Sequence, residues 1–260
     1  MNNSFTFRQF EIQHDRCAMK VGTDGVLLGA WADLSGSNRI LDVGCGSGLI
    51  ALMAAQRAPH SHVWGIDVDA SSVEQALQNV RNSPFSDRVQ LFLQDVRTYS
   101  PSVSFSHILC NPPYYTEQTL PPDDARMRAR HTAYLSLESL LESVERLLEP
   151  QGHFSLILPT QTAEQFITHA MANGWYIVRT CKVFTVAHKP PKRLLLTLSR
   201  ISSDTIENET LVLQEKTGGR TAEYVVLWRF PCDQSCCYEF APHSCAGWRK
   251  SCCTPADHRH

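Results

Sequence analysis

Residues 39–110 alternate short apolar segments with amphipathic segments, and this alternation constrains the fold more than any other feature of the chain. The apolar segments have the length and composition of strands and span residues 39–43, 63–67, 88–93 and 105–110. Two segments between them, 47–57 and 70–81, carry apolar residues at helical spacing. Strands that alternate with helices favour a parallel sheet, because parallel neighbours need a long crossover. The pattern predicts an α/β fold with helices on both faces of the sheet.

The second half of the chain extends this sheet. Further strands are expected at residues 152–158, 174–184 and 193–198. Helices are expected at 133–149 and 160–172, where leucine, isoleucine and phenylalanine recur at helical spacing. A basic loop, 188–192, joins the last two strands, which we expect to pair as an antiparallel hairpin that closes one edge. The sequence therefore predicts a seven-stranded, mostly parallel sheet with an antiparallel edge hairpin.

Composition sets broad limits on what the protein does. The 260 residues carry a net charge of −2 and have a pI near 6.6, so no global electrostatic field recruits nucleic acid. The first residues lack the apolar segment of a signal peptide, and no apolar run approaches the ~18 residues of a membrane span. Four of the ten cysteines are scattered through the first 231 residues, which is typical of a reducing compartment. We expect a cytoplasmic protein that does not enter a membrane.

A rigid turn follows the strand expected at 105–110, with the sequence Asn111-Pro112-Pro113-Tyr114. The prolines cannot continue the strand because they have no N–H group to donate. The chain must therefore leave the sheet at its carboxyl edge, where ligands bind in open α/β sheets. An amide at one end of the turn and an aromatic ring at the other suit a planar amine. An ordinary proline-rich turn is the simpler alternative.

Three glycines, Gly44, Gly46 and Gly48, connect the first strand to the first helix of the alternating region. Their spacing is not that of the dinucleotide fingerprint, and no P-loop lysine follows. Asp67 and Asp95 lie at the ends of the next two strands, where carboxylates can bind ribose and adenine. Each aspartate alone is more typical of a turn or helix cap. Together they outline an adenosine site without a phosphate cradle, as S-adenosylmethionine requires.

These motifs together resemble the class I S-adenosylmethionine-dependent methyltransferases, and specifically the amino-methyltransferases with an Asn-Pro-Pro-Tyr motif. The stretch from His14 to Trp31 resembles bacterial tRNA(Val) adenine-N6-methyltransferases, which modify adenosine 37 beside the anticodon. Within it, Gly22, Gly25 and Gly29 let the backbone pass close to a neighbour. The resemblance covers residues 5 to about 229. It implies a Rossmann-like class I fold.

The resemblance also assigns residues to roles. Residues 1–38 would be a cofactor-covering extension, and 39–229 the methyltransferase domain. The implied S-adenosylmethionine site consists of Lys20, Thr23, Asp42, Gly44, Gly46, Gly48, Asp67, Val68, Asp95 and Val96. The implied catalytic residues are Asn111, Pro112, Pro113 and Tyr114. The side-chain oxygen of Asn111 and the carbonyl of Pro112 can accept hydrogen bonds from the N6 amine, and Tyr114 can stack on the base.

Basic residues outside these motifs indicate an RNA surface. No acidic residue lies between Gln165 and Ser203, and the loop at 115–133 contains several arginines. With tRNA(Val) as the implied partner, we expect backbone contacts from Arg126, Arg130, Lys189, Lys192 and Arg193. The alternative is an ordinary solvated face. No metal is required by this chemistry, and the oligomeric state stays open, with a monomer favoured.

Three other functions remain open at this stage. A protein-glutamine N5-methyltransferase and a guanine-N2 rRNA methyltransferase present a similar planar amine to the same motif. An inactive binding module would keep the cofactor fold without catalysis. The basic segment favours RNA, the His14–Trp31 stretch favours the tRNA enzymes, and an intact Asn111–Tyr114 motif argues against an inactive module.

Residues 230–260 depart from the family pattern. They contain six cysteines, three histidines and one tryptophan without strand or helix periodicity. A metal site on Cys232, Cys236, Cys237 and His243 is one interpretation, although the spacing fits no paired C-x2-C motif. We favour a frameshift that replaced the original end, because the change in composition coincides with the loss of resemblance. This hypothesis predicts a disordered tail.

Overall fold

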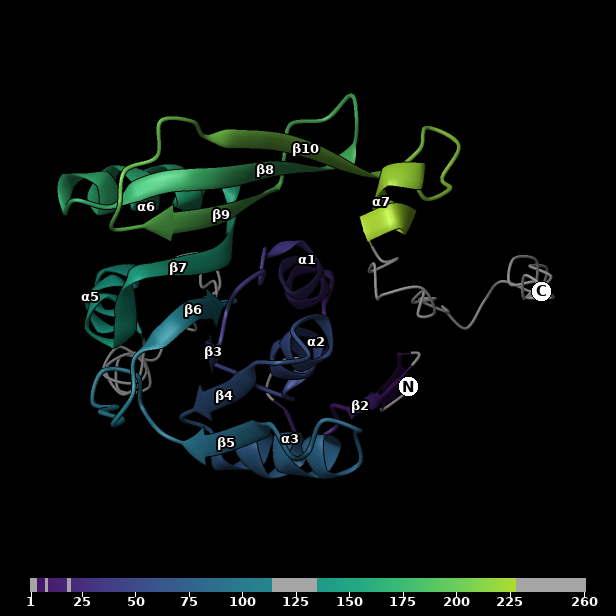
Figure 1. Cartoon of the computed structure of the whole chain (residues 1–260). Helices are drawn as coiled ribbons and strands as arrows, with labels where there is room; N and C mark the ends of the chain where they lie inside the picture. The colour runs from purple at the N-terminus through teal and green to yellow at the C-terminus, as the bar shows by residue number, and fades with distance from the viewer. Residues whose placement is uncertain (1–3, 8, 18–19, 114–134, 228–260) are drawn as a thin grey trace, which may run out of the picture.

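The computed structural model describes residues 4–7, 9–17, 20–113 and 135–227. Among these residues, an eight-stranded sheet runs through the molecule in the order β5, β4, β3, β6, β7, β9, β8, β10 (Figure 1). The strands are β3 (Arg39–Val43), β4 (His62–Asp67), β5 (Val89–Leu93), β6 (Phe105–Cys110), β7 (Leu148–Pro159), β8 (Tyr176–Val186), β9 (Arg193–Ser199) and β10 (Glu207–Gln214). Strand β9 is antiparallel to both of its neighbours, and the other pairs are parallel. The predicted α/β fold and mostly parallel sheet are confirmed.

The predicted number of strands was too low by one. Strand β10 pairs in parallel with β8, from Glu207 opposite Arg179 to Gln214 opposite Val186. The β8–β9 hairpin forms as predicted, but β10 takes the edge position that we assigned to the hairpin. Only Leu211 of β10 is buried, so the strand lacks the apolar signature of the others. It forms because β8 offers it a free edge.

The order in which successive strands join the sheet reverses at β3. From this strand the chain proceeds through β4 to β5 on one side, and β6 then pairs with the other side of β3. Val43 at the end of β3 lies between Ile66 of β4 and Cys110 of β6. The segments that follow β3 and β6 therefore leave the sheet side by side at its carboxyl edge, which is the usual ligand position in such folds.

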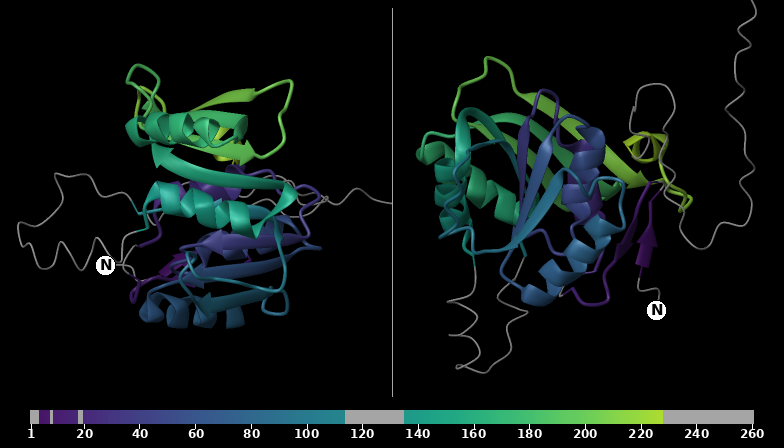
Figure 2. Two further views of the ribbon diagram at one scale, coloured as in Figure 1. Left: turned by 90° about the vertical axis from the view of Figure 1, so that its left-hand side faces the viewer. Right: turned by 60° about the horizontal axis from the view of Figure 1, so that its bottom comes forward.

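Helices cover both faces of the sheet (Figures 1 and 2). One face packs against α1 (Thr23–Trp31), α2 (Leu49–Arg57) and α3 (Ala70–Arg81), and the other against α5 (Leu137–Leu147) and α6 (Thr160–Ala172). Alternate strand residues point to the two faces, so that Leu109 belongs to the α1–α3 core and Ile108 to the α5–α6 core. A short helix, α7 (Ala222–Leu227), follows β10.

Polar side chains determine where several helices begin. Asp69 accepts a hydrogen bond from Ser72 N at 2.9 Å and caps α3. Ser136 accepts one from Ser139 N at 3.1 Å, so α5 begins at Leu137 rather than at the predicted residue 133. The N-cap of α2 is Gly48, which has no side chain to offer. Another residue must therefore cap this helix.

The N-terminal segment is attached along α3. Strands β1 (Ser4–Thr6) and β2 (Glu11–Gln13) form an antiparallel pair. The buried Asn79 amide donates to Gln13 O at 2.8 Å and to Ser47 O at 2.9 Å. One side chain thus joins the N-terminal segment to the loop that follows β3. Within the described residues, no helix has the length and apolarity needed to cross a membrane.

Candidate functional site

The glycine loop after β3 depends on left-handed backbone conformations. Gly44, Gly46 and Gly48 have φ angles of 71°, 52° and 79°, which favour glycine strongly. The loop is held against β4 because Gly44 N and Cys45 N both donate to Ile66 O, at 2.9 and 3.0 Å. A Cβ atom at Gly44 or Gly46 would meet nothing within 4 Å, so one side of the loop is open.

Asp67 ties the end of β4 to this loop. One carboxylate oxygen accepts a hydrogen bond from Gly46 N at 2.8 Å, and the other accepts one from Asp69 N at 3.0 Å. Each oxygen keeps a further lone pair for a hydroxyl donor. The neighbouring Val68 side chain is 63% exposed, which places an apolar surface beside the carboxylate.

Asp42 lies beneath the loop and is fully buried. Its Oδ2 accepts a hydrogen bond from Ala51 N at 3.0 Å, so it caps α2 in place of Gly48. Its Oδ1 has no hydrogen-bond partner. Burial, together with the nearby Asp67 carboxylate, raises the pKa of Asp42 to about 8. This raised pKa favours a neutral Asp42 carboxyl at physiological pH, which the sequence did not indicate.

Asp95 forms a turn after β5. Its carboxylate accepts hydrogen bonds from the Arg97 side chain, and its carbonyl accepts from Thr98 N and Tyr99 N at 3.0 and 2.8 Å. The Arg97 hydrogen bond lowers the pKa of Asp95. Val96 is buried beneath this turn. These contacts match the turn role that we considered for Asp95, and its contact with adenine stays a prediction.

Asn111 follows β6 directly and is half-buried, and Pro112 is buried behind it. A Cβ atom placed on Gly25 would lie 3.8 Å from Asn111 Nδ2 and 3.3 Å from Leu49 Cδ2. The first turn of α1 therefore lies close to the Asn111 amide and to the start of α2. The predicted close approach at Gly25 is confirmed. Tyr114 lies outside the described residues.

The remaining predicted residues lie at the same edge of the sheet. Lys20 and Thr23 are exposed just before and at the start of α1. Lys189 and Lys192 are exposed in the loop between β8 and β9. Arg193 at the start of β9 is partly buried and pairs with Asp24, with 2.8 Å between Nε and Oδ2. The sequence had given no sign of this pair. Arg126, Arg130 and the cysteine-rich segment 230–260 lie outside the described residues.

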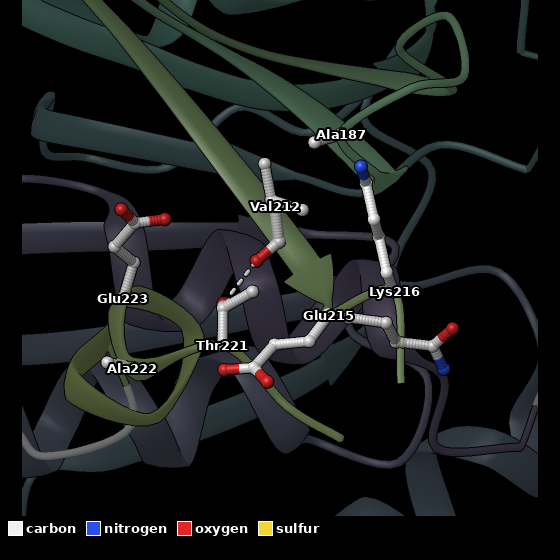
Figure 3. Close-up of a pocket in the computed structure, with 8 residues that line it drawn as sticks. Ala187, Val212, Glu215, Lys216, Thr221, Ala222 and Glu223 are labelled. Carbon is white, nitrogen blue, oxygen red and sulfur yellow. Dashed lines mark hydrogen bonds between the residues drawn. The ribbon is translucent and has the colours of Figure 1, made fainter. Parts of the chain in front are cut away.

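A pocket of about 340 Å³ opens between the end of β10 and α7 (Figure 3). Thr221 closes one side of it and donates a hydrogen bond to Val212 O. Glu215 and Lys216 project from the turn after β10, on opposite sides of the strand end (Figure 3). Among the described residues, no three histidine, cysteine or acidic side chains are arranged to hold a metal ion.

Comparison with known proteins defines the class. The model of the family "Methyltransferase small domain" matches residues 21–187. A predicted O-methyltransferase from Agrobacterium tumefaciens superposes with a TM-score of 0.59 at 21% identity, over 79% of this chain and 95% of that chain. A Listeria monocytogenes protein described as a class I S-adenosylmethionine-dependent methyltransferase gives a TM-score of 0.50 at 16% identity, over 72% and 62%. The protein is a methyltransferase with the class I fold.

Curated relatives narrow this class to one family. A Tolumonas auensis protein named tRNA1(Val) (adenine(37)-N6)-methyltransferase is 43% identical over 226 residues, which cover 86% of this chain and 94% of the relative. A protein of the same name from Pectobacterium carotovorum is 41% identical over 85% of this chain and 90% of its own. The chain belongs to the tRNA1(Val) (adenine(37)-N6)-methyltransferase family, as the resemblance of residues 14–31 predicted.

Proposed function

We propose that this protein transfers a methyl group from S-adenosylmethionine to N6 of adenosine 37 in tRNA1(Val). The observation that carries the proposal is the identity of about 42% to relatives of this name over most of both chains. The arrangement at the carboxyl edge supports it, because Asn111 leaves the sheet beside the glycine loop. A tRNA substrate implies a cytoplasmic enzyme.

The residues at the edge of β3 and β4 fit S-adenosylmethionine. The open side of the loop leaves room for the ligand at Gly44 and Gly46. The free lone pairs of Asp67 suit ribose hydroxyls, and the exposed Val68 side chain suits the flat adenine ring. When bound, the cofactor supplies an electrophilic methyl group. Residues 1–38 would cover this site from the α3 side, where Asn79 attaches the N-terminal segment.

The catalytic contribution of the chain is to position the amine. The exocyclic nitrogen of adenine is a poor nucleophile because its lone pair is delocalised into the ring. The Asn111 side-chain oxygen and the Pro112 carbonyl would accept hydrogen bonds from its two N–H groups, which favours a lone pair aimed at the methyl group. Gly25 lies beside this acceptor, where an added Cβ would come within 3.8 Å of Asn111 Nδ2. Such positioning can supply a large part of the acceleration.

The loop between β8 and β9 is the proposed contact for the tRNA backbone. Lys189 and Lys192 are exposed at the carboxyl edge of the sheet, on the side where Asn111 lies. Lysine side chains there would neutralise phosphates without reading bases. Specificity for adenosine 37 would then come from the pocket around the flipped or splayed base.

The decisive experiment incubates the protein with radiolabelled S-adenosylmethionine and an extract of cells that lack this modification, which contains tRNA, rRNA and protein. Digestion to nucleosides should place the label in N6-methyladenosine of tRNA1(Val). Label in N2-methylguanosine of rRNA, or in protein glutamine, would contradict the proposal. The variant Asn111→Ala should bind the cofactor as the original protein does and lose transfer by at least ~100-fold, because positioning is lost. Full transfer by that variant would contradict the role given to Asn111.

A further inference from the structure

One ion pair connects the proposed RNA side of the molecule to the first turn of α1. The Nε atom of Arg193 lies 2.8 Å from Oδ2 of Asp24. The two side chains are 33% and 24% exposed, so both are largely shielded from water. They are 169 positions apart in the sequence, and the pair fastens the start of β9 to the second residue of α1.

The Arg193 end of this pair is fixed in the sheet. Arg193 lies between Pro159 of β7 and Val183 of β8. The preceding residue is also held, because Lys192 N donates to Val183 O at 2.9 Å and Thr160 N donates to Lys192 O at 3.3 Å. The guanidinium therefore projects from a backbone that is bonded on both sides.

The Asp24 end is less firmly held by the backbone. The first hydrogen bond of α1, from Val26 N to Gly22 O, is 3.4 Å long, which is beyond the usual range. No side chain caps the helix. A carboxylate in the first turn is favoured by the helix dipole, and Arg193 adds a directional contact to it. The ion pair thus adds a restraint at the start of a turn whose own hydrogen bonding is weak, next to the buried residues Val26 and Leu27.

This turn lies beside Asn111. Gly25 follows Asp24 directly, and its missing Cβ would lie 3.8 Å from Asn111 Nδ2. A shift of the turn toward the sheet would press on the amide, and a shift away would widen the space beside it. A displacement of about 1 Å at such a position is enough to reduce catalysis substantially.

We propose that Arg193 is a positioning residue, which acts through Asp24 to hold the first turn of α1 against the Asn111 amide, rather than a contact for RNA phosphates. The inference rests on the proposed function, since it assigns Asn111 to the methyl-transfer site. This inference gives Arg193 a different role from Lys189 and Lys192, whose exposed side chains remain the proposed contacts for the tRNA backbone.

The test compares Arg193→Gln, Asp24→Asn and the double variant in transfer to tRNA. Each single change should lower kcat about fivefold with KM for tRNA unchanged, and the double variant should lose no more than either single. Arg193→Lys should restore most of the rate, because a charged partner returns. If Arg193→Gln instead raises KM and flattens its salt dependence while Asp24→Asn changes neither, Arg193 contacts RNA and the inference is overturned.

A matched control is available at the other end of β9. Arg200 pairs with Glu145 at 3.0 Å, with side chains 34% and 47% exposed. Arg200→Gln removes an ion pair of similar length far from α1, so it should leave kcat unchanged. A loss of kcat equal to that of Arg193→Gln would show that the effect is general and would overturn the inference.

A second readout separates this inference from the proposed function. Hydrogen exchange of the amides of residues 26–28 should accelerate about fivefold in Arg193→Gln and Asp24→Asn, and should not change in Arg200→Gln. This measurement needs no substrate. If the original protein methylates no tRNA, the proposed function fails, whereas unchanged exchange in both variants rejects the ion pair as the restraint on α1.

Discussion

Asp42→Asn should change how the stability of the protein depends on pH. Asp42 is fully buried and caps α2 through Ala51 N, and burial raises its pKa from the ordinary value of 3.8 to about 8. The folded protein therefore keeps this proton between about pH 4 and pH 8, whereas the unfolded chain releases it. Since the folded-state pKa is the higher one, stability from this group is complete below pH 4 and is lost as pH rises through about 8.

The size of this pH dependence follows from the uptake of one proton by the folded protein. Where only the folded state binds it, the free energy of unfolding falls by about 1.4 kcal/mol for each pH unit. From pH 5 to pH 7 the loss is about 3 kcal/mol, which is a large share of the ~5–15 kcal/mol that stabilises a typical domain. Asparagine keeps the oxygen that accepts from Ala51 N and has no proton to lose. The free energy of unfolding of the variant, relative to that of the original protein, should therefore rise by this amount between pH 5 and pH 7.

The assay is urea unfolding of both proteins at pH 5, 6, 7 and 8. The quantity to compare is the difference in free energy of unfolding between the two proteins at each pH. This difference cancels the contribution of buried His107, whose pKa is lowered to about 3 and which makes stability rise with pH below its ordinary value of 6.5. Asp67 acts on Asp42 as a like charge, and the buried thiols of Cys45 and Cys110 nearby have raised pKa values and stay neutral. Parallel curves for the two proteins from pH 5 to pH 7 would refute the assignment of a neutral Asp42.

Three further outcomes are expected. His107→Gln should remove an acid sensitivity, because stability from a neutral buried histidine is present above pH 6.5 and is lost as pH falls toward 3, and urea unfolding at pH 4 and 6 would measure it. Gly48→Ala should cost about 1–3 kcal/mol, measured as a lower Tm, since φ is +79° and the new methyl would lie 3.3 Å from a methyl of α3. Lys189→Gln with Lys192→Gln should reduce the slope of log K for tRNA against log salt by about 1–2, while Arg81→Gln, an exposed position at the C-terminal end of α3, should not.

Local patterns were sufficient to predict most of the sheet. Strands β3 and β6 and the second half of β7 are buried on both faces, so their residues form short apolar runs that are visible in the sequence. The glycine loop was equally visible, because three left-handed positions in five residues leave few alternatives to glycine. Strand β10 was missed because it has one buried residue, Leu211, and depends on pairing with β8.

The candidate site was predictable where one segment determines a property and unpredictable where two distant segments share it. The positions of Asn111 and Asp67 follow from the strands that they end, whatever surrounds them. By contrast, Asp24 and Arg193 each look like a surface charge in sequence, and only the meeting of α1 with β9 makes them a pair. The same applies to Asp42, whose neutral state depends on the complete burial that α2 and its neighbours impose. Sequence alone therefore assigns the wrong role to a charged residue where packing pairs it with a distant partner, and the wrong charge where packing removes water.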